Sequence, residues 1–177
     1  MRQPQEIVTR HFGESIFAAR HLFPKSEPGT AAAAPGSGSP LARTHVIDIG
    51  SGAGFPGLPI KLWAPEVDLT LIESSQKKAT FLREVVRSLK LTGVEVFMGR
   101  ADGFEGPKGQ VVTLRAVEHF ESIIPVAAGL VTSSGRLAVL IGEAQVKHIR
   151  ERVPGFDWAV PVGLPISSNR VLIIGRK

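Results

Sequence analysis

Short apolar runs alternate with amphipathic segments from residue 45 to the end of the chain. Runs rich in Val, Ile and Leu are typical of buried strands, and apolar residues every three or four positions are typical of helices. This pattern predicts strands at residues 45–49, 67–73, 94–98, 110–115, 136–141, 157–162 and 170–174. It predicts helices at residues 58–63, 76–90, 118–131 and 143–152.

The segment 76–90 has the clearest helical pattern. Ser74 or Ser75 can cap its start, and Gly93 follows its end. One apolar stripe runs along it, formed by Phe81, Leu82, Val85, Val86 and Leu89. Regular alternation of strands and helices predicts an α/β fold, with a doubly wound, Rossmann-like parallel sheet that has helices on both faces.

The chain before residue 45 has a different composition. Residues 28–40 contain only Pro, Gly, Thr, Ala and Ser, which is typical of a flexible connector. The residues before it carry one apolar helical face, formed by Ile7, Phe12, Ile16, Phe17 and Leu22. We therefore predict a helical segment at 1–27 that packs back on the domain, a linker at 28–44 and a main domain at 45–177.

Composition narrows the class of protein. The 177 residues are 43% hydrophobic and 21% charged, which suits one globular domain. The chain has no cysteine, so disulfides, thiolate metal sites and thiol nucleophiles are excluded, and we expect a cytoplasmic protein. No apolar stretch reaches the roughly 18–20 residues of a membrane span, and we expect no membrane passage. The net charge of +5 is dispersed along the chain and permits a polyanionic partner.

A glycine-rich loop follows the first predicted strand of the domain. Its Gly50, Gly52 and Gly54 have GxGxG spacing, and a predicted helix comes next. Glycines there allow positive φ angles and let a ligand approach the backbone. Asp48 lies two positions before the first glycine and is not part of a GxGxxG dinucleotide fingerprint. This combination favours S-adenosylmethionine as the cofactor.

Two acidic residues lie at or just after the ends of the next two predicted strands. Glu73 ends the second strand, 23 residues after Gly50. This is near the separation of about 20 residues expected for a carboxylate that accepts from ribose hydroxyls. Asp102 belongs to the sequence Gly-Arg-Ala-Asp after the third strand. Its carboxylate and the exposed backbone beside it could read an adenine edge.

Several phrases of the chain resemble the bacterial 16S ribosomal RNA guanine-N7 methyltransferases, the RsmG or GidB family. The loop phrase DIGSGAGFPGLPI at 48–60 carries the resemblance most specifically. Similar phrases are LTLIESSQKKATFLREVV at 69–86, GRAD at 99–102, TLRAV at 113–117 and TRHFGES at 9–15. The last phrase has Glu-Ser where the family has Asp-Ser.

The resemblance implies a class I S-adenosylmethionine-dependent enzyme that methylates N7 of a guanine in 16S rRNA of the small ribosomal subunit. It implies a cofactor site lined by Gly50, Phe55, Ala101, Asp102 and Arg115, with Glu73 near the ribose. Arg115 would lie at the mouth of that site, where a guanidinium holds a carboxylate or phosphate. Candidates for contact with RNA phosphates are Lys77, Lys78 and Arg100.

Guanine N7 carries a lone pair and no proton, so the reaction requires no general base. We therefore expect no catalytic acid–base residue and a rate that depends on positioning. The five histidines show neither metal-ligand spacing nor a Ser/His/Asp motif, and we expect no metal. Among the five histidines, His11 is the best candidate for a direct chemical role, because it belongs to the family-like Arg-His pair.

The chain departs from the family pattern at its start and at its fifth strand. The N-terminal segment is shorter, and Ile141-Gly142 stands where the family has Lys-Gly. Other functions therefore stay open: a non-catalytic ribosome-binding scaffold, a small-molecule methyltransferase or a nicotinamide-dependent oxidoreductase. The target is the RNA or the assembled subunit, and we expect the chain to be a monomer.

Overall fold

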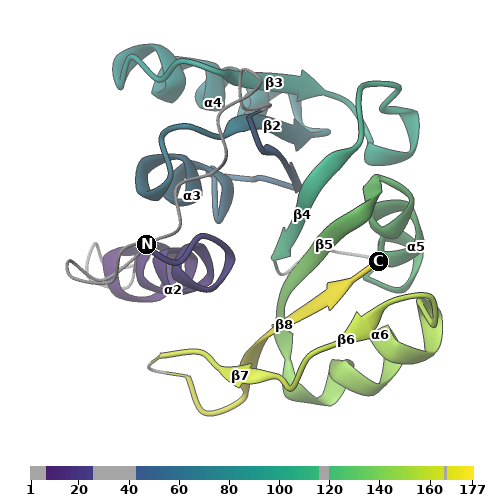
Figure 1. Ribbon diagram of the computed structural model, residues 1–177. Coiled ribbons are helices and arrows are strands. Elements are labelled where there is room, and N and C mark those ends of the chain that lie inside the picture. Colours follow the sequence, from purple (N-terminus) through teal and green to yellow (C-terminus); the bar gives the residue numbers. More distant parts are fainter. Residues whose placement is uncertain (1–6, 26–42, 116–119, 166) are drawn as a thin grey trace, which may run out of the picture.

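The computed structural model describes residues 7–25, 43–115, 120–165 and 167–177, which fold around one sheet (Figure 1). Its strands are β1 (His45–Ile49), β2 (Asp68–Glu73), β3 (Val94–Met98), β4 (Gly109–Arg115), β5 (Val131–Gly142), β6 (Asp157–Trp158), β7 (Val162–Gly163) and β8 (Arg170–Arg176). Its α-helices are α2 (Gly13–Leu22), α3 (Gly57–Trp63), α4 (Gln76–Ser88), α5 (Phe120–Gly129) and α6 (Val146–Arg152). A π-helical turn, η1 (Ile7–Phe12), precedes α2, and two 3-10 turns are η2 (Ala101–Gly103) and η3 (Glu143–Gln145).

The strands have the order β3-β2-β1-β4-β5-β8-β6, and β7 pairs with β8. The first five strands pair in parallel, as predicted. The expectation of a wholly parallel sheet is wrong at the other edge, where β8 runs antiparallel to β5, β6 and β7. A short loop joins β7 to β8, and only antiparallel strands can be joined by such a loop. The start of β8 therefore lies at the same edge as the carboxyl ends of β1, β4 and β5.

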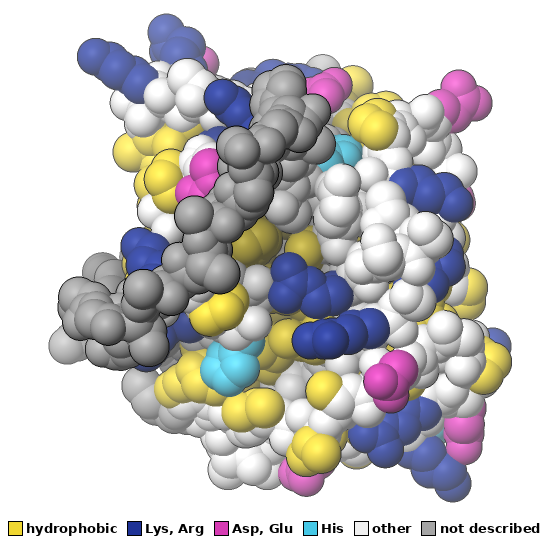
Figure 2. All heavy atoms as spheres, in the orientation of Figure 1, with side chains coloured by type: hydrophobic (Ala, Val, Ile, Leu, Met, Phe, Trp, Pro, Cys, Tyr) yellow, Lys and Arg dark blue, Asp and Glu magenta, His cyan; other side chains and the backbone are white. Residues whose placement is uncertain are grey.

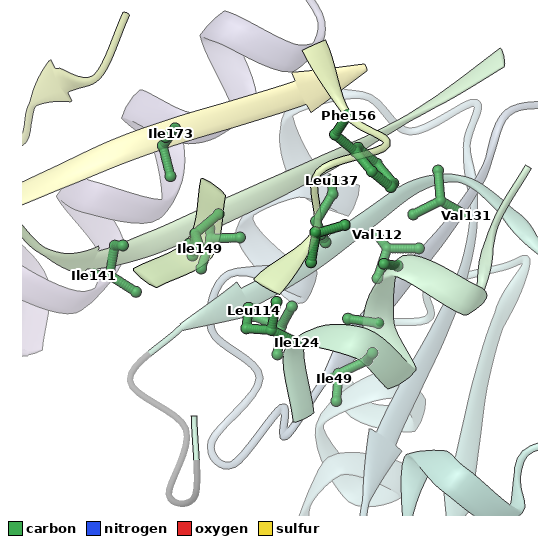
Figure 3. Close-up of a cluster of buried hydrophobic side chains, with 14 of the residues drawn as sticks. Ile49, Val112, Leu114, Ile124, Val131, Leu137, Ile141, Ile149, Phe156 and Ile173 are labelled. Atoms are coloured by element: carbon green, nitrogen blue, oxygen red, sulfur yellow. The ribbon is translucent and has the colours of Figure 1, made fainter. Parts of the chain in front are cut away.

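Helices cover both faces of the sheet, so the predicted doubly wound architecture is confirmed (Figure 1). Alternate residues of β1 show the two layers, because Val46 packs toward α2, α3 and α4 while Ile47 packs toward α5 and α6. Figure 3 shows the second layer, in which Ile124 of α5 and Ile149 of α6 lie against the sheet. Burial of these residues holds α5 and α6 against the sheet and so fixes the edge where the carboxyl ends of β1, β4 and β5 lie.

The N-terminal helix buries a face that only partly matches the predicted one. Its buried hydrophobic residues are Ala18, Ala19 and Leu22, which pack with α3, whereas Phe12 is 38% exposed. Glu14 is also buried and lies on the same helical face as these alanines. Small side chains at this face allow α2 to lie close to α3. The predicted face is confirmed at Leu22 and wrong at Phe12, and it missed the small residues because it followed the largest ones.

Several predicted boundaries differ from the observed ones. The turn expected at 134–135 lies within the long strand β5. The strand expected at 157–162 is two short strands. Phe81 and Leu89 are 51% and 52% exposed, because α4 packs beside the thinly covered edge strand β3 and buries only Ala79 and Leu82.

Some predictions fall on residues outside the described ranges. Most of the predicted linker lies within 26–42, and the first residues of the helix predicted at 118–131 lie within 116–119. The division into 1–27, 28–44 and 45–177 therefore stays a prediction. Within the described ranges, no helix combines the length and the apolar character needed to cross a membrane.

Candidate functional site

The glycine loop leaves β1 at the carboxyl edge of the sheet and leads into α3. The backbone N–H groups of Gly50 and Ser51 both donate to the carbonyl of Ile72, at 2.9 and 3.1 Å, which fastens the loop to β2. The φ angles of Gly50, Gly52 and Gly54 are 68°, 58° and 94°. The prediction that this turn requires positive φ is confirmed.

Gly52 and Gly54 have different physical reasons for being glycine. A Cβ on Gly54 would lie 2.3 Å from Cδ1 of Leu58, so this glycine is required by packing. A Cβ on Gly52 would meet only the carbonyl of Gly50, at 3.8 Å, and would otherwise point into open space. Gly52 is therefore the position where a ligand can approach the backbone.

Asp48, near the end of β1, binds the backbone at the start of α3 and so holds the loop between them. Its side chain is fully buried; Oδ2 accepts from the N–H of Gly57 at 3.2 Å and Oδ1 accepts from the Thr113 hydroxyl at 2.9 Å. Burial raises the pKa of Asp48 from its ordinary value of 3.8 to about 6, although these hydrogen bonds oppose the rise. Its carboxylate fixes the start of α3 and lies under the loop, so direct contact with a cofactor stays a prediction.

Glu73 holds the loop from the end of β2. Its Oε2 accepts from the N–H of Gly52 at 2.9 Å, and its Oε1 accepts from the N–H of Ser75 at 2.8 Å. The residue is buried, with 5% exposure. A carboxylate has about four acceptor positions, so two stay available for ribose hydroxyls. The structure brings Glu73 to the loop, as its predicted role requires.

A cleft of about 550 Å³ opens beside this loop, within the range of roughly 300–1,000 Å³ typical of small-ligand sites. Its walls include Gly50, Gly52, Phe55, Arg10, Arg115 and Arg170. An open glycine backbone, free acceptor positions on a carboxylate and several guanidinium groups suit a ligand with ribose hydroxyls and an anionic group. The residues present therefore fit an S-adenosyl cofactor.

One buried carboxylate joins the N-terminal helix to this cleft. Glu14, which is 1% exposed, accepts from Nη2 of Arg115 at 3.1 Å and from Nη1 of Arg170 at 2.7 Å. Burial lowers the pKa of the Arg115 guanidinium, and the hydrogen bond and charge of Glu14 oppose that effect. Arg115 was predicted at the mouth of the site, whereas Arg170 was not predicted because its position depends on the antiparallel pairing of β8.

The position where a lysine was expected from the family resemblance lies at the end of β5, beside Arg170. Ile141, which stands in its place, is 4% exposed and belongs to the core beneath α6. The next residue, Gly142, pairs in register with Arg170. The strand end therefore receives its cation from β8 rather than from β5.

His11 and Phe55 form an aromatic wall of the same cleft. Their ring centroids are 5.8 Å apart with an interplanar angle of 30°. Nη2 of Arg115 lies 2.6 Å from Nδ1 of His11. A guanidinium can only donate, so Nδ1 accepts and the imidazole carries its proton on Nε2. The structure thus brings Phe55, Arg115 and His11 together.

The Gly-Arg-Ala-Asp segment is arranged differently from its predicted roles. Ala101 is buried in the core, with 5% exposure, so only its backbone is available to a ligand. Asp102 accepts from Nε and Nη2 of Arg100, at 3.2 and 3.1 Å, and this keeps the pKa of Asp102 below its ordinary value. The predicted adenine-reading carboxylate and the predicted phosphate-binding guanidinium are therefore bonded to each other.

The two predicted lysines differ in their relation to the cleft. Both are exposed in the first turn of α4, but Lys78 lines the cleft and Lys77 does not. Within the described ranges, no group of three or more His, Asp or Glu side chains is arranged to hold a metal ion.

Comparison with known proteins gives one consistent family. The family described as rRNA small subunit methyltransferase G (GidB) matches residues 1–154. The ribosomal RNA small subunit methyltransferase G of Xylella fastidiosa is 32% identical over 183 residues, covering 100% of this chain and 76% of the relative. The protein of the same name from Chloroflexus aggregans is 36% identical over 189 residues, covering 100% of this chain and 72% of the relative.

Solved methyltransferase structures share the fold. P. horikoshii TYW2 in complex with MeSAdo has a TM-score of 0.67 at 14% identity, covering 99% of this chain and 63% of that chain. Magnesium protoporphyrin IX methyltransferase (ChlM) from Synechocystis, with bound SAM, has a TM-score of 0.65 at 16% identity, covering 76% and 70%. The predicted class I S-adenosylmethionine-dependent methyltransferase fold is confirmed by this likeness.

Proposed function

The chain belongs to the rRNA small subunit methyltransferase G family, and from this premise we propose that it transfers a methyl group from S-adenosylmethionine to N7 of a guanine in 16S rRNA. The observation that carries the proposal is the cleft at the carboxyl edge of the sheet. There the open backbone of Gly52 is held by Glu73, and the side chains of Arg10, Lys78, Arg115 and Arg170 also line the cleft.

The cofactor site of this proposal joins four parts of the chain. The backbone of Gly50 and Gly52 forms its floor, Glu73 accepts from the ribose, and Phe55 forms one apolar wall. Arg115 receives an anionic group at the mouth. Gly54 and Asp48 keep the loop in shape, and the backbone at Ala101 and Asp102 contacts the adenine.

The cofactor, when bound, supplies a methyl group on a positively charged sulfur. The guanine N7 lone pair attacks without losing a proton, so the chain has no proton to remove. Its residues instead hold both reactants in line, and near-attack positioning contributes up to about 7–11 kcal/mol in favourable cases. The aromatic wall of His11 and Phe55 excludes water from one side of the reacting base.

RNA would approach the same face through its phosphates. Lys78 and Arg10 line the cleft, whereas Lys77 and Arg100 are exposed but do not belong to its lining. Figure 2 shows Lys and Arg side chains at the centre of one face, with few acidic side chains between them. A cationic rim suits a structured RNA whose target base is unstacked into the cleft.

We further propose that the chain acts as a monomer in the cytoplasm. The described lining of the cleft comes from η1, the loop after β1, the start of α4, the end of β4 and the start of β8. The proposed substrate is a small-subunit RNA or the subunit itself, which the enzyme must meet in that compartment.

Transfer of a labelled methyl group from S-adenosylmethionine to small ribosomal subunits that lack the guanine-N7 mark tests the proposal. We expect label in the 16S RNA, recovered as N7-methylguanosine after digestion, and its loss in a Gly52→Ala variant. Large subunits serve as the substrate control. The absence of label in subunits, or its recovery on another atom, would refute the proposed activity.

A further inference from the structure

Glu14 links three elements that are far apart in the sequence. Its carboxylate comes from α2 and accepts from Arg115 at the end of β4 and from Arg170 at the start of β8. Arg170 Nη1 contacts both carboxylate oxygens, at 2.9 and 2.7 Å. The side chains of Arg115 and Arg170 are 9% and 16% exposed, so this is a buried cluster that reaches the cleft.

The two guanidinium groups of the cluster share one hydrogen-bonded carboxylate, that of Glu14. A second buried carboxyl, that of Asp48, interacts with Arg115 through its charge. Nε of Arg115 and Nη2 of Arg170 are buried and have no hydrogen-bond partner among the described residues. Buried charges and donors are costly unless they are paired, so an acceptor bound at these two nitrogens would stabilise the cluster.

Guanidinium side chains are long and flexible and must be held in place to present their N–H groups. Glu14 restrains both side chains through hydrogen bonds. Each guanidinium uses only part of its donor set in these bonds and keeps a further N–H group for another acceptor. Removal of this carboxylate would leave two positive charges without the hydrogen-bonded partner that they share. It would also remove the ion pairs that join α2 to the end of β4 and the start of β8.

We propose that Glu14 is a positioning residue for methyl transfer, orienting Arg115 and Arg170 as a receptor for an oxyanion in the cleft. This inference rests on the proposed function, because the oxyanion is either the carboxylate of the cofactor or a phosphate of the RNA. A planar carboxylate and a tetrahedral phosphate both offer oxygen acceptors to paired guanidinium groups. The N-terminal helix thereby becomes part of the site.

Glu14→Gln removes the charge and retains the size of the side chain. Glu14→Asp retains the charge and is the residue of the family-like motif. Glu84→Gln is the matched control, since Glu84 also pairs with an arginine at 2.7 Å but in an exposed pair on α4. The measurements are the Kd for S-adenosylmethionine and for its decarboxylated analogue, and the KM and kcat with unmethylated small subunits.

A cofactor carboxylate in the receptor gives a Kd for S-adenosylmethionine about tenfold or more higher in Glu14→Gln, with little change for the decarboxylated analogue. An RNA phosphate instead gives an unchanged Kd, a KM for subunits raised by a similar factor and a weaker salt dependence. Either result supports the receptor, and Glu14→Asp should recover most of the loss.

Unchanged Kd and KM in a folded Glu14→Gln protein would overturn the inference. An equal loss for both cofactor analogues, without recovery in Glu14→Asp, would also overturn it, because it would indicate a collapsed cleft. If Glu14→Gln does not fold, Arg170→Gln makes the same test with the Glu14–Arg115 pair intact. Failure of the proposed function is distinguishable, since the unaltered protein would then methylate no subunits.

Discussion

The carboxylate of Glu73 accepts a hydrogen bond from the backbone N–H of Gly52 over 2.9 Å, which joins the end of β2 to the most open turn of the cofactor loop. The same side chain accepts from the N–H of Ser75 at the start of α4. One residue therefore organises the loop and the helix that border the cleft, and it keeps acceptor positions for a ligand.

Glu73→Gln should weaken cofactor binding and stability together. An amide oxygen can accept from one of the two backbone N–H groups, while the amide NH2 faces the other, and an unpaired buried donor costs about 1–3 kcal/mol. We expect the Kd for S-adenosylmethionine, measured by calorimetry, to rise roughly tenfold or more. Glu95→Gln, at an exposed position of β3, is the control. A normal Kd in Glu73→Gln would contradict this role.

Gly52→Ala and Gly54→Ala should separate binding from folding. At Gly52 the added Cβ enters open space at a φ of 58°, so we expect a modest loss of about 1 kcal/mol in stability and a large loss of cofactor binding. At Gly54 the Cβ collides with Leu58 at a φ of 94°, so we expect a much lower Tm. Calorimetric unfolding with and without cofactor measures both effects. Equal destabilisation of the two variants would refute the distinction.

Asp48 should make folding stability dependent on pH. Its pKa is about 6 in the folded protein and 3.8 as the ordinary value, so the carboxyl contributes stability that is present below 3.8 and lost as the pH rises through 6. The loss amounts to about 3 kcal/mol when complete. Relative to the unaltered protein, Asp48→Asn should therefore gain stability between pH 4 and pH 7.

Urea unfolding of both proteins at several pH values within this interval measures that change, because the titration of the other groups largely cancels in the difference. The Asp48→Asn substitution is not expected to leave Thr113 unpaired, since the new side-chain amide can donate to the hydroxyl. A stability difference that does not vary with pH would show that Asp48 ionises normally.

Lys78→Ala should weaken RNA binding more than Lys77→Ala. Both residues are exposed in the same helical turn, but only Lys78 lines the cleft. We expect a higher KM for small subunits with an unchanged Kd for cofactor, and a salt slope reduced by about 0.7–0.9 for one lost phosphate contact. Lys147→Ala on α6 provides an exposed lysine control. Equal effects at Lys77 and Lys78 would place the RNA path outside the cleft.

Local sequence patterns determined the parts of this protein that depend on neighbouring residues. The apolar run before Gly50 forms β1, and the three glycines adopt positive φ, because backbone sterics act within a few positions. The place of Glu73 at the end of β2 was predictable for a different reason, because parallel strands place their carboxyl ends at one edge of the sheet. The family-like phrases likewise pointed to Phe55 and Arg115, and both residues line the cleft.

Only the tertiary structure decided which distant groups meet at that edge. Arg170 reaches the cleft because β8 is antiparallel, and no pattern within the strand itself encodes the direction of its pairing. Glu14 is buried against two arginines, whereas the helical pattern around it favoured the larger apolar residues. Long-range ion pairs and strand order are set by packing of the whole chain, so the cofactor loop could be predicted from sequence and the arginine cluster could not.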